Sequence, residues 1–364
     1  MADLTVDVAG IGFRNPILPA AGPPGRDGEA LVRCAEGGAG GLVAKTISVA
    51  PAEPPIPNIA EVAHGMVNVE LWSELPPEQW LAIELPRARA TGLPLIVSLG
   101  YSASDIAALA PRVRPFADAL ELSTHYIGED AEPMVAAIRA AKAAVDVPVL
   151  VKLSPLGREM ARAAEQAAEA GADGIVAINS FGPVLALDPA TGRPRLGGPD
   201  GVGWLSGPAI RPLAMRCVRD IARAVDLPVI GVGGISSGRD AAEMLMAGAS
   251  AVGVCTAAIL RGPSMFGRIA AELDSWLDEH GIASARELRG MALPPPVAAS
   301  WPGQPEIDAA ACNGCDLCTT SCPYRAIAVT DGLAVIDRTA CQRCGLCVTR
   351  CRRGAISWET AASL

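Results

Sequence analysis

The cysteines of this sequence are concentrated at its C-terminal end. Of the eleven cysteines among 364 residues, eight lie between Cys312 and Cys351. They form two runs of identical spacing, Cys-x2-Cys-x2-Cys-x3-Cys, namely Cys312, Cys315, Cys318 and Cys322, then Cys341, Cys344, Cys347 and Cys351. In such runs three thiolates bind one [4Fe–4S] cluster, and the fourth binds the other cluster. The spacing therefore predicts one cluster on Cys312, Cys315, Cys318 and Cys351, and a second on Cys341, Cys344, Cys347 and Cys322.

Structural zinc is the alternative for these cysteines. Zinc ribbons use two Cys-x2-Cys pairs about 15–20 residues apart, however, rather than doubled triplets. Next to the second run, Arg350, Arg352 and Arg353 form a basic rim. This rim either raises the potential of the nearby cluster, docks an acidic electron carrier, or is an ordinary solvated run of charge.

Two lysines in the rest of the chain indicate a second redox centre, to which the clusters would pass single electrons. The sequence has only three lysines, and Lys45 and Lys152 each lie at the end of an apolar run. An ammonium group at such a position could hold the anionic edge of an isoalloxazine ring. The alternative is a lysine whose charged end merely reaches solvent.

Glycines late in the chain predict a phosphate site. Ser206-Gly207, Gly233-Gly234 and Gly253 come late in the barrel, and glycines at the last two apolar runs let backbone N–H groups close on a phosphate. The three-glycine dinucleotide fingerprint is missing, because Gly10-Ile11-Gly12 has neither the following helix nor the third glycine. FMN therefore fits better than NAD or FAD.

The elements that must position these residues follow a regular alternation. Short apolar runs alternate with amphipathic Ala-rich stretches, and eight such units predict an α/β chain with a (β/α)8 TIM barrel. A doubly wound sheet is the alternative. The apolar runs are Pro16–Ala20, Gly41–Lys45, Pro94–Leu99, Asp118–Leu122, Pro148–Leu153, Gly174–Ile178, Pro228–Val232 and Ala251–Val254.

Two connections, 46–75 and 181–207, are unusually long and would lie at the face where barrel enzymes build their sites. We predict a barrel domain over 1–290, a Pro-rich linker over 291–305, and a small α+β ferredoxin-like domain over 306–364.

Composition excludes several classes of protein. Half of the residues are hydrophobic and 19% are charged, which excludes a disordered chain. The net charge of −9 argues against nucleic acid and acidic membranes as partners. No apolar run approaches the roughly 20 residues that span a bilayer, and the N-terminus has no signal-peptide pattern. We expect a cytoplasmic protein.

The sequence resembles a family of flavoproteins. Its barrel is similar to that of dihydroorotate and dihydropyrimidine dehydrogenases, and its C-terminal part is similar to bacterial two-cluster ferredoxins. The motifs that match are Asn15–Gly22, Lys45-Thr46, Asn68–Glu74, Lys152, Asn179-Ser180, Ser206-Gly207, Gly233–Ile235 and Val254–Thr256.

This resemblance implies which residues bind FMN and substrate. The residues expected to contact FMN are Ala20, Ala21, Gly22, Lys45, Thr46, Lys152, Gly207, Gly233, Gly234, Ile235, Cys255 and Thr256. The residues expected to hydrogen-bond the substrate are Asn68, Glu70, Asn179 and Ser180, with Ser123 at the position of a further substrate-binding asparagine. The family also implies a homodimer.

One segment departs from the family pattern. After the fourth apolar run, family members carry Asn-Leu-Ser-Cys-Pro or a form with Ser for Cys, and that Cys or Ser moves the proton. Here Ser123 replaces Asn, His125 replaces Ser, and Tyr126 takes the catalytic position. A tyrosine near its usual pKa of about 10 is a poor base at neutral pH but a usable acid. A tyrosine at this position therefore favours reduction of the substrate, with Tyr126 as the proton donor and His125 as the rival donor.

We expect an FMN and iron–sulfur oxidoreductase that reduces a C=C bond conjugated to a carbonyl. Electrons would enter from a ferredoxin or an NAD(P)H-oxidising reductase subunit and pass through the clusters. The alternative is an electron-transfer subunit without a substrate site of its own. Lyase or isomerase chemistry on the barrel is a third hypothesis, but it needs no pair of clusters.

Overall fold

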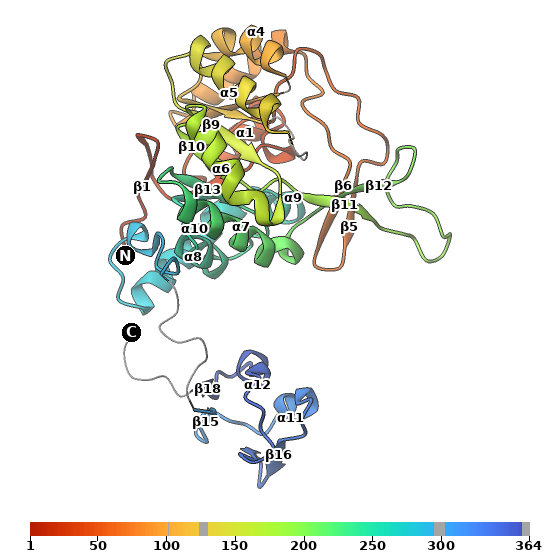
Figure 1. Ribbon diagram of the computed structural model, residues 1–364, viewed down its shortest axis with the longest axis vertical. Coiled ribbons are helices and arrows are strands. Elements are labelled where there is room, and N and C mark those ends of the chain that lie inside the picture. Colours follow the sequence, from red (N-terminus) through yellow and green to blue (C-terminus); the bar gives the residue numbers. More distant parts are fainter. Residues whose placement is uncertain (101, 124–129, 295–302, 359–364) are drawn as a thin grey trace. The chain divides into compact units, whose positions relative to one another are not determined.

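The computed structural model describes residues 1–100, 102–123, 130–294 and 303–358. The chain divides into two compact units, Met1–Pro294 and Pro295–Leu364 (Figure 1). Within the described ranges, no helix is both long enough and apolar enough to cross a bilayer.

The first unit is a barrel of eight parallel strands, which confirms the predicted fold. The strands are β3 (Ile17–Pro19), β4 (Leu42–Val43), β7 (Leu95–Leu99), β8 (Ala119–Leu122), β9 (Val149–Leu153), β10 (Gly174–Ala177), β13 (Val229–Val232) and β14 (Ala251–Val254). Each lies within one of the eight apolar runs, and their order is β3-β14-β13-β10-β9-β8-β7-β4. The backbone N–H of Gly40 donates to the carbonyl of Ile17 at 2.8 Å and joins the two ends of this sheet.

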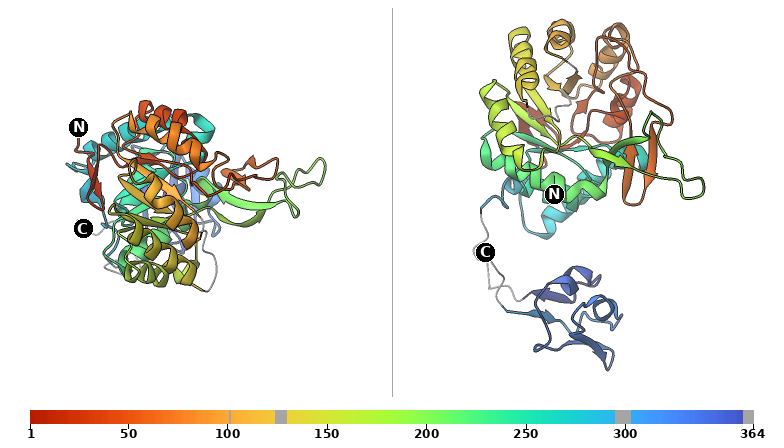
Figure 2. Two further views of the ribbon diagram at one scale, coloured as in Figure 1. Left: turned by 90° about the horizontal axis from the view of Figure 1, so that it is seen from above. Right: turned by 45° about the vertical axis from the view of Figure 1, so that its right-hand side comes forward.

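Helices surround the strands (Figure 2). They are amphipathic, and many bury small side chains, as α6 does with three alanines beside Met160, so that they pack closely on the barrel. The main helices are α1 (Gly28–Glu36), α3 (Leu85–Arg89), α4 (Ala103–Val113), α5 (Glu132–Ala144), α6 (Met160–Glu169), α7 (Arg211–Ala224), α8 (Gly238–Met246), α9 (Thr256–Arg261) and α10 (Met265–Glu279). Shorter turns are η1 (Pro23–Gly25), α2 (Pro77–Gln79), η2 (Trp80–Glu84), η3 (Gly157–Glu159), η4 (Pro208–Ile210) and η5 (Ala285–Leu288).

The two long connections pair with each other in a sheet that extends from the barrel (Figure 1, Figure 2). Its strands are β5 (Ile59–Val62), β6 (Gly65–Asn68), β11 (Phe181–Leu185) and β12 (Val202–Ser206), in the antiparallel order β11-β12-β6-β5. The central pairing places Trp204 opposite Asn68. The sequence predicted only loops here, and this sheet is the main element of the barrel unit that it missed.

The ends of the predicted linker lie on the two units. Gly290 and Ala292 donate backbone hydrogen bonds to Leu245 and Met246, which holds the start of this segment on the barrel. Pro305, at its other end, begins strand β15 (Pro305–Ile307). Residues 295–302 lie outside the described residues, so the linker itself stays a prediction.

The second unit is a small α+β domain with an internal repeat. Strand β15 pairs with β18 (Ile356–Trp358), and β16 (Ile327–Thr330) pairs with β17 (Leu333–Ile336). Two short helices, α11 (Leu317–Ser321) and α12 (Leu346–Arg350), follow the cysteine loops. The two halves match in detail, since Cys312 and Cys341 each donate a backbone hydrogen bond of 3.0 Å to the aspartate four residues earlier.

A short hairpin, β1 (Val6–Val8) with β2 (Ile11–Phe13), precedes the barrel.

The contact that closes the barrel between β3 and β4 can be tested by substitution. A Cβ atom added at Gly40 would collide with the carbonyl oxygen of Asn15, a buried residue that caps Ile17. We expect Gly40→Ala to destabilise the barrel by about 2 kcal/mol, because close-packed backbone cannot move aside. The measurement is the thermal midpoint, which should fall by about 5 °C.

The matched control is Gly12→Ala, because an added Cβ at Gly12 meets no atom within 4 Å. Equal midpoints for the two variants would show that the barrel does not depend on this contact.

Candidate active site

A cavity of about 470 Å³ lies at the C-terminal ends of the barrel strands and beneath the four-stranded sheet. Its lining includes all twelve residues predicted to contact FMN and all five predicted to contact substrate. Its volume lies in the range of about 300–1,000 Å³ that is usual for small-molecule sites. Tyr126 and His125, the predicted proton donors, lie outside the described residues, so their placement stays a prediction.

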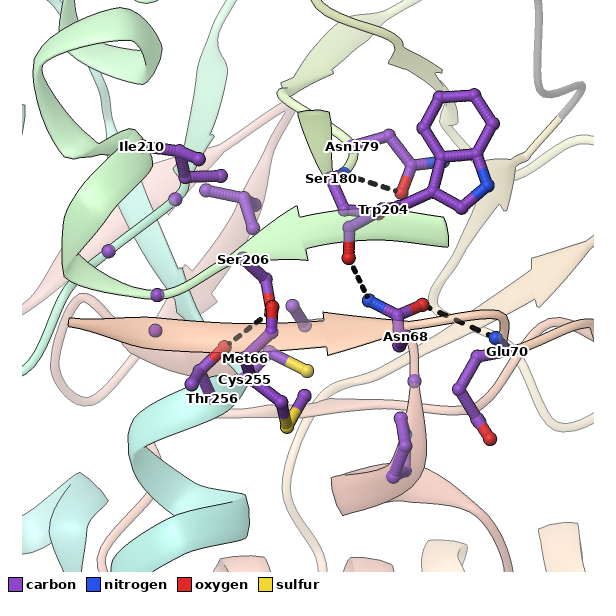
Figure 3. A pocket seen from close by; sticks show the side chains of 18 of the residues that line it. Met66, Asn68, Glu70, Asn179, Ser180, Trp204, Ser206, Ile210, Cys255 and Thr256 are labelled. Carbon is purple, nitrogen blue, oxygen red and sulfur yellow. Dashed lines mark hydrogen bonds between the residues drawn. The ribbon is translucent and has the colours of Figure 1, made fainter. Parts of the chain in front are cut away.

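The four-stranded sheet supplies one wall of this cavity (Figure 3). The Asn68 amide donates to the Trp204 carbonyl at 3.1 Å, and its oxygen accepts the Glu70 N–H at 3.3 Å. On the opposite loop, the Asn179 side-chain oxygen accepts the Ser180 N–H at 2.9 Å. Both asparagines are thereby held with their amides at the cavity wall, where they can pair with a carbonyl or N–H of a ligand.

Lys45 is neutralised by two carboxylates. Its ammonium lies 2.8 Å from Glu70 and 2.8 Å from Glu74, and its side chain is only 4% exposed. The other oxygen of Glu70 accepts a hydrogen bond from Asn58. Because a buried ammonium without partners costs several kcal/mol, these ion pairs fix the connection between β6 and α2 against the barrel.

Lys152 has a different environment. Its ammonium is also buried, and among the described residues it contacts the Glu121 carboxylate and the Ala21 carbonyl, both at 3.5 Å. Glu121 in turn accepts a hydrogen bond from Ser98, which contacts Thr46 at 2.9 Å. A buried cation with such long contacts can still donate to an anionic ligand group, as an isoalloxazine edge requires.

Two loops on the opposite side of the cavity approach each other through glycines. Gly207 (φ 91°) and Gly234 (φ 77°) have left-handed backbone, and a Cβ at Gly234 would lie 2.9 Å from the Gly207 carbonyl. Asp240 holds the second loop, because it accepts the Ser236 N–H at 2.9 Å and the Ser236 hydroxyl at 2.8 Å. It also pairs with Arg211. A cradle of bare backbone with this support fits a phosphate group.

The three cysteines of the barrel are protonated thiols near neutral pH. Burial raises the pKa of Cys255 to about 11, so its thiol stays protonated at neutral pH. Cys34 and Cys217 lie buried on the outer helices α1 and α7, where burial raises the pKa to about 12 and about 11. None of the three is therefore a thiolate, or a base, near neutrality.

The cysteines of the second unit surround two separate cavities. One is lined by Cys312, Cys315, Cys318 and Cys351, and the other by Cys322, Cys341, Cys344 and Cys347. In the described residues, no three such side chains converge on a single ion. Four thiols spread around a cavity are the arrangement that a cubane cluster needs.

Several lining residues were not predicted to bind FMN or substrate. Trp204 and Met66 reach the cavity from the four-stranded sheet, as does Ser206, which the sequence singled out only together with Gly207, and Arg261 comes from the end of α9. Ser206 accepts a hydrogen bond from Thr256 at 2.9 Å and so ties the sheet to α9. The turn Ala63-His64 between β5 and β6 is not one of the Gly or Asn pairs that mark a hairpin in a sequence, which is why the hairpin was not predicted, and His64 lines the cavity as well.

The fold and these sites define an iron–sulfur flavoprotein oxidoreductase. A model of the dihydroorotate dehydrogenase family matches residues 3–277, and a model of 4Fe-4S dicluster domains matches residues 304–352. The chain therefore belongs to the dihydroorotate dehydrogenase family. It acts on CH–CH bonds, and its cofactors are FMN and two [4Fe–4S] clusters, as predicted.

The chain is similar to catalytic subunits of dihydroorotate dehydrogenase B (NAD(+)) from several organisms. It is 36% identical over 305 residues to that of Thermococcus kodakarensis, which covers 80% of this chain and 99% of the relative. For Methanothermobacter thermautotrophicus the identity is 38% over 302 residues, with 79% and 98% covered. For Geobacter sulfurreducens it is 36% over 301 residues, with 79% and 97% covered. About a fifth of this chain therefore lies outside these alignments.

The Asp240 contacts lead to a prediction for FMN binding. Asp240→Asn keeps the shape of the side chain but removes the charge that holds Ser236 and Arg211. We expect the dissociation constant of FMN to rise about tenfold, measured by quenching of flavin fluorescence on the flavin-depleted full chain.

The control variant is Glu243→Gln, which removes another carboxylate near Arg211, at 3.7 Å, without touching the glycine loop. If both variants weaken FMN binding equally, Asp240 has no particular role in holding the loop.

Proposed function

We propose that this chain reduces a C=C bond conjugated to a neutral carbonyl or cyclic amide, with electrons delivered through its own clusters. The observation that carries the proposal is the pairing of Lys45 with Glu70 and Glu74 at 2.8 Å. A carboxylate substrate needs a cation that is free to bind it, and this lysine already has two carboxylate partners.

The other charged groups of the cavity support a neutral substrate. Among the described lining residues, the remaining cations are Lys152, Arg261 and, when protonated, His64. Lys152 lies on the side of the predicted flavin ring, and Arg261 ends α9, the helix that begins at the predicted FMN-binding residue Thr256. The polar groups left for substrate are amides, hydroxyls and the Glu70 carboxylate, which suit carbonyl and N–H groups.

Each residue has a role in this proposal. When bound, FMN supplies the hydride that reaches the β-carbon of the conjugated bond. Asn68 and Asn179 hydrogen-bond the carbonyl or amide and orient the double bond. Tyr126 donates the proton to the α-carbon, and His125 is the rival donor. The cluster ligands are the two sets of four cysteines named above.

Electrons come from another protein in this proposal. The relatives are named as catalytic subunits of NAD(+)-dependent enzymes, which implies that a further polypeptide handles the nicotinamide. We infer a ferredoxin or an NAD(P)H-oxidising reductase subunit as the donor for this chain, a cytoplasmic location and a homodimer. The alternative function, electron transfer without a substrate site, does not explain the polar wall that Asn68 and Asn179 form.

The first prediction concerns the proton donor. Both Tyr126→Phe and His125→Ala should retain flavin. The variant that removes the true proton donor should react with a cyclic enone or uracil about 100-fold more slowly or worse, as seen in the reoxidation of reduced flavin. The measurement is anaerobic stopped-flow absorbance. If both variants reoxidise at the wild-type rate, the assignment of this loop is wrong, and if the wild type reacts with no acceptor of this class, the proposed function is wrong.

The second prediction concerns the charge balance at Lys45. Uracil and orotate differ only by the carboxylate of orotate, so they isolate the effect of charge. Glu70→Gln removes one partner of Lys45 and should tighten orotate binding about tenfold, because the ammonium becomes available to a ligand carboxylate. The measurement is the flavin difference spectrum on titration of the oxidised protein. Unchanged orotate affinity in this variant would contradict the proposed role of the pair.

A further inference from the structure

The two halves of the iron–sulfur unit have the same backbone but opposite charge. The first cysteines, Cys312 and Cys341, are 29 positions apart, and that offset places Gly314 in register with Arg343 and Asp316 with Gly345. Asp316 (φ 65°) and Gly345 (φ 78°) are both the left-handed residue that precedes a short helix. The cysteine loop of the first half thus carries Asp316 where the second has a glycine, and the loop of the second half carries Arg343 where the first has a glycine.

These differences fall beside different clusters. Arg343 and Gly345 line the cavity of Cys322, Cys341, Cys344 and Cys347, whereas Asp316 lines the other cavity, along with Arg353. The turn that contains Asp331 also packs on the first loop, since a Cβ at Gly314 would touch Gly332. The cavity of Cys322, Cys341, Cys344 and Cys347 is therefore bordered by positive charge, and the other by a mixture of both signs.

Exposed apolar side chains lie at the edge of the cavity of Cys322, Cys341, Cys344 and Cys347. Tyr324 and Leu346 line it and are 47% and 41% exposed, and the side chains of Arg343 and Cys344 lie at the surface. An apolar centre with a charged rim is the usual anatomy of a transient protein interface. The chain as a whole carries a net charge of −9, so an acidic partner is repelled by most of its surface and attracted here.

We propose that electrons enter through the cluster bound by Cys322, Cys341, Cys344 and Cys347, from an acidic one-electron carrier protein that docks on Tyr324, Leu346 and Arg343. This inference rests on the proposed function, because it assumes that the clusters carry electrons inward. In each encounter the carrier loses one electron and the cluster gains one, and no bond forms or breaks. A carrier that docks at the surface needs a cluster near the surface, and the exposed Cys344 provides this. Cys315 of the other cluster is exposed as well, so the choice of cluster rests on the charge around each cavity.

The test uses the anaerobic holoprotein and a strongly acidic reduced ferredoxin as the probe. Arg343→Gln should lower the second-order rate constant of cluster reduction about tenfold at low ionic strength, and the difference should shrink at about 0.5 M salt. Gly345→Asp, which copies Asp316 of the other half, should lower it in the same way. Binding of the oxidised ferredoxin to the oxidised protein, measured by calorimetry, should weaken in parallel.

Arg353→Gln is the matched control, since it removes one exposed arginine beside the other cluster. Iron content and the spectra of the reduced clusters must be unchanged in all three variants, which separates docking from cluster loss. A larger effect of Arg353→Gln than of Arg343→Gln, or a wild-type rate that does not depend on salt, would overturn the proposal.

A small uncharged reductant such as a photoreduced deazaflavin distinguishes this inference from the proposed function. The variants should be reduced by it at the wild-type rate, because it needs no docking surface. If the flavin then passes electrons to no unsaturated acceptor, the proposed function is wrong. The docking inference is judged separately, by the rates of reduction with ferredoxin.

Discussion

The ion pairs of Lys45 are the interaction on which the cavity depends. A buried ammonium must be compensated, and this chain uses Glu70 and Glu74 from the connection that follows β6. The same connection is tied to the barrel where the Ser73 N–H donates to the Thr46 carbonyl at 2.8 Å. Asn68, whose side chain accepts the Glu70 N–H, is positioned as a consequence. One group of contacts thus neutralises Lys45, positions the connection after β6 and determines the charge of the ligand that the cavity accepts.

The second unit complements this cavity chemically. A flavin exchanges electrons with a C=C bond in pairs, whereas an iron–sulfur cluster passes them singly. A chain that contains both can collect single electrons from a carrier and deliver them as a pair. The relatives align with about 80% of this chain, and in the proposed function the dicluster domain makes part of the electron path intrinsic to it.

The sequence predicted what depends on local pattern. The eight barrel strands are short apolar runs bounded by Gly or Pro, and the cysteine sets follow a fixed spacing, so both could be recognised. The four-stranded sheet could not, because β6 and β12 pair across 136 residues and β11 contains Gly182 and Pro183. Glu74 and Asp240 were missed for a related reason, since each acts through another residue that only the fold brings near. Tyr126 and His125 remain predictions from the sequence.

The central claim is that the clusters and the flavin of one chain form a single electron path to a neutral unsaturated substrate. The most direct measurement is an anaerobic single turnover of the fully reduced protein, with no other protein present, followed by absorbance and electron paramagnetic resonance. Two electrons on FMN and one on each cluster suffice for about two equivalents of product, and we predict that amount, with the cluster signals lost alongside the flavin. About one equivalent, with clusters that stay reduced, would contradict the account.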